Sequence, residues 1–289
     1  MRYVLAIGDR SYSSWSLRAW LLFAGFDIPA TVERAFMGTQ AFPQMLSRFG
    51  AARTVPAMRG GDVVCWDSLA ILDTLAEAHP GAGLWPQAPA DRALARSLVA
   101  EMHSGFSALR NVCPMNLRTA FTGFVPDDDV LADLTRLETL WSLARGTGRD
   151  GPWLFGAYGA ADAFFAPVAA RIAGYGLPLA AHQPYVAAHL AHAPFRQWRA
   201  MGIAEAYEQI RYRNALTPAS WPGPIPRPAQ VVGAGTAENT VCPFSGDPVA
   251  ADALLRMDGR IIGFCNSFCR DKVAADPEAW PRAMALLQR

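Results

Sequence analysis

The feature that most limits how this chain can fold is a run of prolines late in the sequence, at positions 218, 222, 224, 226 and 228. Proline fixes its own φ angle and has no backbone N–H, so Thr217–Ala229 cannot form a helix or a central strand. We expect a semi-rigid spacer or an arm that wraps around a neighbouring domain. The chain therefore divides into a long N-terminal part and a short C-terminal module.

The composition allows a large core and argues against several classes of partner. The chain has 289 residues, of which 52% are hydrophobic, and a net charge of +1. This length suits two domains or one domain with attachments, and the near-zero charge predicts no nucleic-acid partner. No secretory signal precedes the first strand, and charged, glycine or proline residues interrupt every apolar run before it could span a membrane. We expect a cytoplasmic protein with no membrane partner.

The pattern of apolar residues predicts an α+β protein with four parts. Residues 1–82 alternate strand and helix, beginning with the strand Tyr3–Ile7 and including a hairpin across Gly60-Gly61 and a helix over Leu69–Ala78. Residues 83–212 are helical throughout, with proline and glycine between segments and no strand. Residues 213–238 form the proline-rich linker, and residues 239–289 regain strand and helix signals as a small module. The predicted helices of the second part are Asp91–Asn111, Asp127–Arg145, Ala160–Gly174, Pro184–Leu190 and Pro194–Glu205.

A hydroxyl-rich stretch, Ser11–Arg18, follows the first strand and opens the first helix. Ser13 or Ser14 can cap this helix. A helix N-terminus has unpaired N–H groups and a partial positive charge, so it favours an anion, and a serine hydroxyl there can donate to a bound thiolate. The alternative is an ordinary N-cap with no role in binding.

Three motifs together resemble the cytosolic glutathione transferase family, in its bacterial serine-type subgroup, over roughly residues 1–212. They are the hydroxyl-rich stretch Ser11–Arg18, called the serine loop below, Val55-Pro56 at the place of a cis proline, and the acidic-Ser motif Trp66–Leu72. In the helical part, the segments that match are Glu101–Phe106, Pro114–Arg118 and Ala161–Val168.

This resemblance implies a thioredoxin-like domain, an all-α domain, a homodimer and glutathione as co-substrate. Ser13 would lower the pKa of the glutathione thiol by a hydrogen bond rather than act as a nucleophile, and Ser11, Tyr12 and Ser14 are rival candidates. The predicted glutathione-binding residues are Arg53, Val55, Pro56, Asp67 and Ser68. The predicted pocket for the second substrate consists of Trp15, His103, Phe106, Met115, Asn116 and Arg118.

Several of these residues also have plain structural interpretations. Ser68 can serve only as an N-cap and Arg53 can be a solvated surface charge. Phe106 and Met115 can belong to the core, and His103 can be a structural histidine.

The C-terminal module contains Cys242, Cys265 and Cys269, the last two at i and i+4 near the start of a helix. Three thiolates converging in a module too small for a large core predict a metal site. Asp258-Gly259 predicts a hairpin between the first cysteine and the other two. The spacing resembles TRASH and YHS-type metal-binding domains and implies a zinc-ribbon-like fold.

Zinc is the default ion for such a site, and copper or iron also suit sulfur ligands. The sequence leaves the fourth ligand open between Asp247, Asp271 and water.

The leading hypothesis is therefore a glutathione S-transferase with an added metal-binding module. One alternative is a non-catalytic scaffold of the same fold with a metal-sensing or metal-carrying role. The other is a glutathione-dependent isomerase of the zeta type, although the Ser-Ser-Cys loop of that class is absent here.

Overall fold

The computed structural model describes residues 2–288, which form two compact units. Unit 1 comprises the chain up to Leu190 together with Arg211–Pro222, and unit 2 comprises Ala191–Ile210 and the chain from Gly223 onward. The predicted α+β class is confirmed. One helix, α9 (Ala193–Ala204), was expected in the helical domain but groups with the C-terminal module in unit 2.

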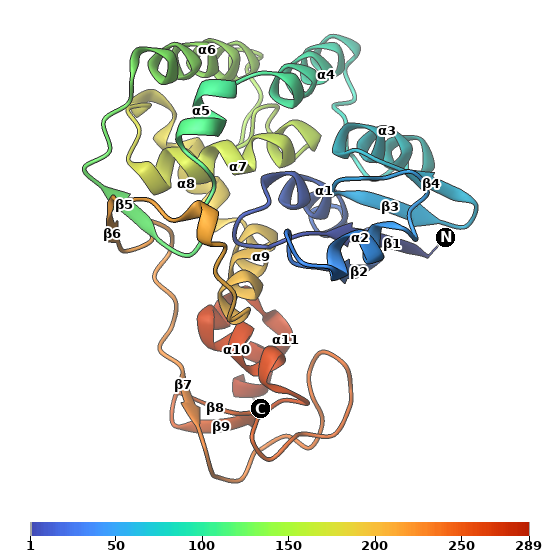
Figure 1. Ribbon diagram of the computed structural model, residues 1–289, viewed down its shortest axis with the longest axis vertical. Coiled ribbons are helices and arrows are strands. Elements are labelled where there is room, and N and C mark those ends of the chain that lie inside the picture. Colours follow the sequence, from blue (N-terminus) through green and yellow to red (C-terminus); the bar gives the residue numbers. More distant parts are fainter. Residues whose placement is uncertain (1, 289) are drawn as a thin grey trace. The chain divides into compact units, whose positions relative to one another are not determined.

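Unit 1 begins with a four-stranded mixed sheet of order β2-β1-β3-β4. β1 (Tyr3–Ile7) runs parallel to β2 (Ala30–Arg34) and antiparallel to β3 (Ala57–Gly60), which pairs with β4 (Val63–Cys65). The helices of this region are α1 (Ser14–Ala24), α2 (Ala41–Leu46) and α3 (Ser68–Ala78). This is the predicted thioredoxin-like domain, with the hairpin and both longer helices near their expected places (Figure 1).

The next part of unit 1 is predominantly helical, as predicted (Figure 1). Its helices are α4 (Pro89–Ser104), α5 (Ser107–Val112), α6 (Asp128–Arg145), α7 (Ala160–Tyr175) and α8 (Gln183–Ala191). Helix α7 is buried along almost its whole length and packs against α1 and α4. The single helix predicted over Asp91–Asn111 is wrong, because Phe106 adopts a left-handed backbone conformation (φ 58°) that ends α4 and starts α5.

A short two-stranded sheet contradicts the expectation that no strand follows residue 83 in the helical part. β5 (Ala120–Thr122) pairs with β6 (Thr217–Ala219), so Phe121 lies opposite Pro218. A ribbon of two strands has only edges, and an edge strand tolerates the missing N–H of proline. Arg211–Pro222, called the strap below, therefore returns to unit 1 instead of acting as a free spacer (Figure 1).

Unit 2 contains a three-stranded antiparallel sheet of β7 (Gln230–Val232), β8 (Leu254–Met257) and β9 (Arg260–Gly263). β7 lies inside the expected linker. The predicted Asp258-Gly259 hairpin turn is confirmed, with positive φ at both residues. Helix α10 (Ser267–Ala275) packs against α9, and Arg196 forms an ion pair with Asp276 (2.6 Å) that joins the two segments of this unit.

Within residues 2–288, no helix has the length and apolar character needed to cross a bilayer.

Candidate functional site

The start of α1 holds a chain of hydroxyl groups. Ser13 is the N-cap, and its Oγ accepts a hydrogen bond from the backbone N–H of Ser16 (3.2 Å). Ser13 Oγ also donates to Ser16 Oγ (2.8 Å), which accepts from the N–H of Gly8 just after β1 (3.1 Å). Ser13 is therefore a true helix cap that is also tied to the end of the neighbouring strand.

The two rival serines differ from Ser13 in position. Ser14 is the first residue of α1 and does not act as the cap. Ser11 is buried, its carbonyl accepts from the N–H of Leu117 (3.0 Å), and its hydroxyl has no hydrogen-bond partner among residues 2–288. Neither Ser11 nor Ser14 lines the cavity described next.

A cavity of about 510 Å³ in unit 1 brings four of the predicted site residues together. They come from separate segments: the serine loop supplies Ser13 and Trp15, the segment before β3 supplies Val55, and the start of α3 supplies Asp67. The other lining residues, none of which the sequence analysis had singled out, are Met37, Gly38, Phe42, Thr54 and Arg211.

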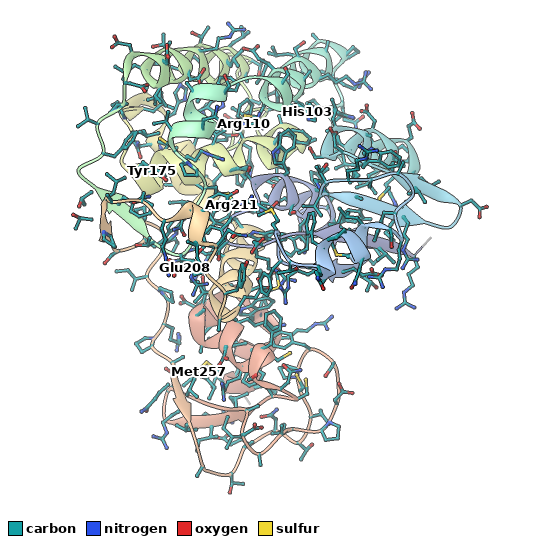
Figure 2. All side chains as sticks on the ribbon, in the orientation of Figure 1. His103, Arg110, Tyr175, Glu208, Arg211 and Met257 are labelled. Atoms are coloured by element: carbon teal, nitrogen blue, oxygen red, sulfur yellow. The ribbon has the colours of Figure 1, made fainter. Side chains whose placement is uncertain are left out.

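Val55 and Pro56 are joined by a cis peptide bond, as predicted. Val55 lines the cavity, whereas Pro56 is buried beside it and does not line it. Arg53 is exposed and lies outside the cavity wall. The cation that does line it is Arg211, which the strap supplies (Figure 2).

At the start of α3, the structure exchanges the expected roles of Asp67 and Ser68. Asp67 is the N-cap, with Oδ1 accepting from the N–H of Leu69 (3.0 Å), and Ser68 is the first helical residue. The Ser68 hydroxyl is fully buried and has no partner in the described part of the chain. The other oxygen of Asp67, Oδ2, is 3.2 Å from Nε2 of His103.

His103 links α4 to this wall of the cavity (Figure 2). Its ring stands edge-on to Trp15, with centroids 5.2 Å apart. Burial lowers the pKa of His103, the Asp67 carboxylate acts in the opposite direction, and the guanidinium groups of Arg18 and Arg110 lower it further. At neutral pH the imidazole is therefore uncharged, and it contacts both Asp67 and Trp15.

Two arginines place positive charge next to Trp15. The guanidinium carbons of Arg18 and Arg110 lie 4.0 Å and 4.6 Å from the centroid of its ring. Arg18 is almost completely buried, and that burial lowers its pKa to about 9. Its Nε and Nη1 atoms have no hydrogen-bond partner within residues 2–288. The Asp67 carboxylate offsets this buried charge only in part, so the charge favours an anion near Trp15.

The remaining residues of the predicted second-substrate pocket do not line this cavity. Phe106 and Met115 are buried in the core, which is their plain structural interpretation. Asn116 uses its Oδ1 to accept from the backbone N–H of Arg118 (2.9 Å), so it shapes its own turn. Trp15 and His103 are the members of the set that the structure places at or beside the cavity.

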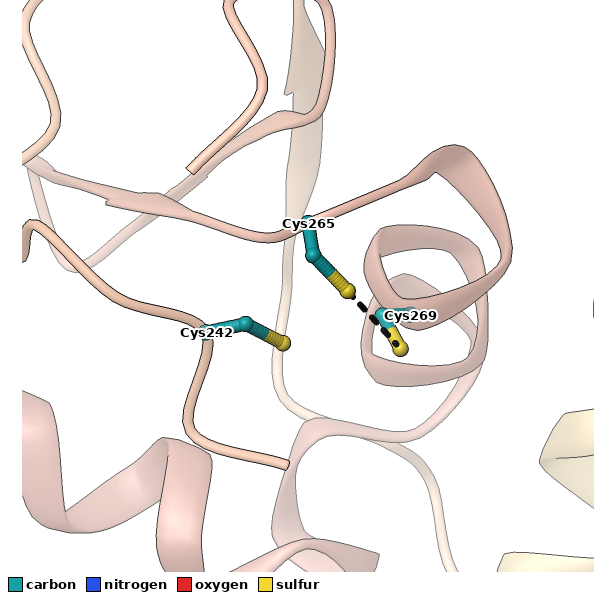
Figure 3. A group of neighbouring side chains, drawn as sticks. All are labelled: Cys242, Cys265 and Cys269. Carbon is teal, nitrogen blue, oxygen red and sulfur yellow. Dashed lines mark hydrogen bonds between the residues drawn. The ribbon is translucent and has the colours of Figure 1, made fainter. Parts of the chain in front are cut away.

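In unit 2 the three predicted cysteines, Cys242, Cys265 and Cys269, converge and are called the Cys triad below (Figure 3). Their sulfur atoms all lie within 4.8 Å of one another, and those of Cys265 and Cys269 are 4.0 Å apart. A tetrahedral ion bound about 2.3 Å from each sulfur requires sulfurs about 3.8 Å apart, which small side-chain movements would achieve. Among the described residues, neither Asp247 nor Asp271 joins this group.

Hydrogen-bond donors around Cys242 and Cys265 suit thiolates, whereas burial raises the pKa of Cys269 to about 12. Ser245 Oγ (3.4 Å) and Asn266 Nδ2 (3.2 Å) both donate to the sulfur of Cys265. Burial acts to raise the pKa of Cys242, but backbone N–H groups, including that of Ser245, outweigh it and bring the value to about 7. The Cys triad therefore has the donor set and the hydrogen bonds of a soft-metal site.

Comparisons with known proteins agree with the architecture of unit 1. Residues 12–78 match the family model of the glutathione S-transferase N-terminal domain. A crystal structure of a glutathione transferase homolog from Burkholderia gl BGR1 with bound glutathione aligns with a TM-score of 0.53 and 21% identity. It covers 70% of this chain and 98% of that protein.

Two curated relatives carry related names. Rat maleylacetoacetate isomerase is 32% identical over 106 residues, which are 36% of this chain and 48% of that protein. Glutathione S-transferase 1 of Dianthus caryophyllus is 29% identical over 180 residues, which are 59% of this chain and 77% of that protein. The chain thus spans about half the length of the first of these. Residues 12–78 are thus similar to the N-terminal domain of glutathione S-transferases, and unit 1 has the glutathione transferase fold.

Proposed function

We propose that the protein is a glutathione S-transferase that activates the glutathione thiolate for attack on a small electrophile. The observation that carries this proposal is the cavity itself. It gathers Ser13, Val55 and Asp67 beside the buried hydroxyl of Ser68, inside the segment that matches the glutathione S-transferase domain. Each of these groups has a chemical counterpart on the tripeptide.

The γ-glutamyl end of glutathione fits the start of α3. Asp67 lines the cavity and can pair with its ammonium, and the adjacent Ser68, whose buried hydroxyl has no partner among the described residues and does not itself line the cavity, is the candidate donor to its carboxylate. The backbone of Val55 can pair with the cysteinyl residue in the manner of an added strand. Arg211, rather than the exposed Arg53, is the candidate for the glycyl carboxylate because it lines the cavity.

Ser13 is then the candidate that meets the sulfur. A hydroxyl donor at the N-terminus of α1, with the buried charge of Arg18 close by, favours the thiolate over the thiol and lowers a pKa that is ordinarily about 8.5. The thiol proton leaves to solvent, and the thiolate forms a carbon–sulfur bond with the electrophile as the leaving group departs.

For unit 2 we infer a metal site formed by Cys242, Cys265 and Cys269. The convergence of their sulfurs and the donors around Cys265 support it, and zinc is the default ion, with copper or iron as alternatives. Such an ion would stabilise the module by cross-linking the loop of Cys242 to the start of α10. The TRASH or YHS character of the module remains part of this proposal, as does a homodimer.

A glutathione-dependent isomerase is the second candidate, and the likeness to rat maleylacetoacetate isomerase favours it. In such a reaction the thiolate would add to an unsaturated substrate and leave again, so the same cavity residues would serve. The serine loop has Tyr12 between Ser11 and Ser13, which separates it from the Ser-Ser-Cys pattern.

The test compares wild type with the Ser13→Ala variant. We expect calorimetry to show glutathione binding by both, and conjugation to an aryl halide to fall sharply in the variant. Isomerisation of maleylacetoacetate without conjugation would favour the isomerase. Binding without either reaction would support the non-catalytic scaffold, and absence of glutathione binding would refute the transferase proposal.

A further inference from the structure

Ser16 is fully buried in the first turn of α1, and the proposed chemistry does not yet use it. Its Oγ accepts from the N–H of Gly8 (3.1 Å) and lies 2.8 Å from Ser13 Oγ. With Ser13 as donor, Ser16 Oγ accepts two hydrogen bonds, and the Ser16 hydroxyl proton has no acceptor among residues 2–288. The arrangement therefore leaves one buried proton unused.

Rotating the hydroxyl groups of Ser13 and Ser16 about their Cβ–Oγ bonds gives the Ser16 proton an acceptor. A distance of 2.8 Å between two hydroxyl oxygens suits either of them as the donor. When Ser16 donates, Ser13 Oγ accepts from both the N–H and the hydroxyl of Ser16, so its two lone pairs are filled. The Ser13 proton is then free to point into the cavity that Ser13 lines. Every polar group of this turn has a partner once an acceptor occupies the cavity.

We propose that Ser16 is a positioning residue that makes Ser13 a hydrogen-bond donor only, and so selects the thiolate form of bound glutathione. This rests on the proposed function. With its lone pairs filled, Ser13 cannot accept a hydrogen bond from an S–H group, whereas it can donate to S⁻. The same geometry favours Ser13 over its rivals, because Ser11 and Ser14 neither line the cavity nor receive such a pair of hydrogen bonds.

The test is the pKa of the bound glutathione thiol, followed by the ultraviolet absorbance of the thiolate in wild type, Ser16→Ala, Ser13→Ala and the double variant. Ser16→Ala keeps the backbone N–H that Ser13 caps but empties one lone pair of Ser13. We expect its bound-thiol pKa to rise by about one unit, a tenfold loss of thiolate at neutral pH. The double variant should match Ser13→Ala, because Ser16 acts through Ser13.

Two controls separate this role from a structural one. Ser97→Ala removes an exposed helix hydroxyl that bonds only its own helix, and its bound-thiol pKa should equal that of wild type. Calorimetry should show that Ser16→Ala still binds glutathione with nearly unchanged affinity. A bound-thiol pKa in Ser16→Ala equal to that of wild type, or a further rise in the double variant, overturns the proposal.

The variant is expected to be less stable, because Gly8 loses its acceptor. Ser16→Cys, which keeps a weak donor of similar size, should therefore fall between wild type and Ser16→Ala in thiol pKa. If wild type itself binds no glutathione, the transferase proposal and this one fall together. If wild type binds and only the Ser16 series is flat, this one alone fails.

Discussion

The two candidate sites of this protein are built on opposite principles. In unit 1, residues that would contact the ligand also stabilise the fold, because Ser13 caps α1 and Asp67 caps α3. In unit 2, the sulfurs of the Cys triad cap no helix, and the module around them has short strands. Loss of a residue in unit 1 should therefore reduce binding and stability by separate, measurable amounts. Loss of a cysteine in unit 2 should remove metal and fold together.

The largest effect is expected from Cys265→Ser. Because a structural zinc ion contributes on the order of 10 kcal/mol to small metal domains, loss of one thiolate should abolish stoichiometric metal and make the module sensitive to protease. Metal analysis by mass spectrometry and limited proteolysis measure this. Cys65→Ser, a cysteine on β4 of unit 1, is the matched control and should retain the metal. Wild-type protein purified without metal under reducing, chelator-free conditions would contradict the assignment.

The next largest effect separates the two duties of Ser13. Glycine is nearly as good an N-cap as serine, whereas alanine costs about 1 kcal/mol. Ser13→Gly and Ser13→Ala should therefore lose turnover alike, by roughly 100-fold if the hydroxyl is a key hydrogen-bond donor to the sulfur. Only Ser13→Ala should also lower the melting temperature. Equal activity in Ser13→Gly and wild type would remove Ser13 from the chemistry and leave it as a cap.

Asp67 allows the same separation at the other end of the cavity. Asparagine caps a helix about as well as aspartate, so Asp67→Asn should leave the free energy of unfolding nearly unchanged. The variant lacks the charge that would pair with the γ-glutamyl ammonium, and glutathione affinity should fall about tenfold, in line with loss of a charged hydrogen bond. Calorimetry with glutathione and with an analogue lacking the amino group provides the check. The variant should weaken only the first ligand.

The His103–Asp67 pair predicts how unit 1 depends on pH. The folded-state pKa of His103 is depressed below its ordinary 6.5, chiefly by burial. Because the pKa is depressed, the stability that the neutral imidazole of His103 contributes is fully present above pH 6.5. It is lost as the pH falls through the folded-state pKa. Protonated His103 would also compete with the ligand ammonium for Asp67. Thermal melts and glutathione titrations across this range should both weaken towards acid pH, and His103→Gln should flatten the two profiles.

Much of unit 1 could be predicted from sequence, because its signals are local. The Val55-Pro56 dipeptide, the serine loop and the Gly60-Gly61 hairpin each determine structure within a few residues. The convergence of the three cysteines was also predicted, although only Cys269 lies on α10 and Cys265 precedes its N-cap, Asn266. The features that sequence reasoning missed depend on contacts between distant segments. β5 and β6 are three-residue strands about a hundred residues apart, one of them with a proline. Sequence alone also could not show that Asp67 rather than Ser68 would be the cap.

Arg211 is the clearest example of such a residue and gives the smallest expected effect. The strap delivers it: Tyr212 packs on Tyr12 of the serine loop with ring centroids 5.1 Å apart, and β6 is tied to β5. The guanidinium is 3.6 Å from the sulfur of Met37, a weak acceptor, and acts electrostatically on the buried Asp9 carboxyl, although Arg211 forms no direct ion pair among the described residues. Its donors are therefore available to a carboxylate at the mouth of the cavity. Because exposed ion pairs contribute about 0.2–1 kcal/mol, Arg211→Gln should weaken glutathione binding by only about two- to fivefold.

A ligand whose glycyl carboxylate is blocked shows whether this small effect comes from that carboxylate. Glutathione esterified at its glycyl carboxylate should bind wild type and Arg211→Gln equally, whereas free glutathione should distinguish them. The same pair of ligands applied to Arg53→Gln tests the residue that sequence reasoning had favoured for this role. If free glutathione distinguishes wild type from Arg53→Gln no better than the ester does, while Arg211→Gln weakens only the binding of free glutathione, the strap supplies the carboxylate contact. The reverse pattern would return that role to Arg53 and leave the strap with the purely structural duty of covering the serine loop.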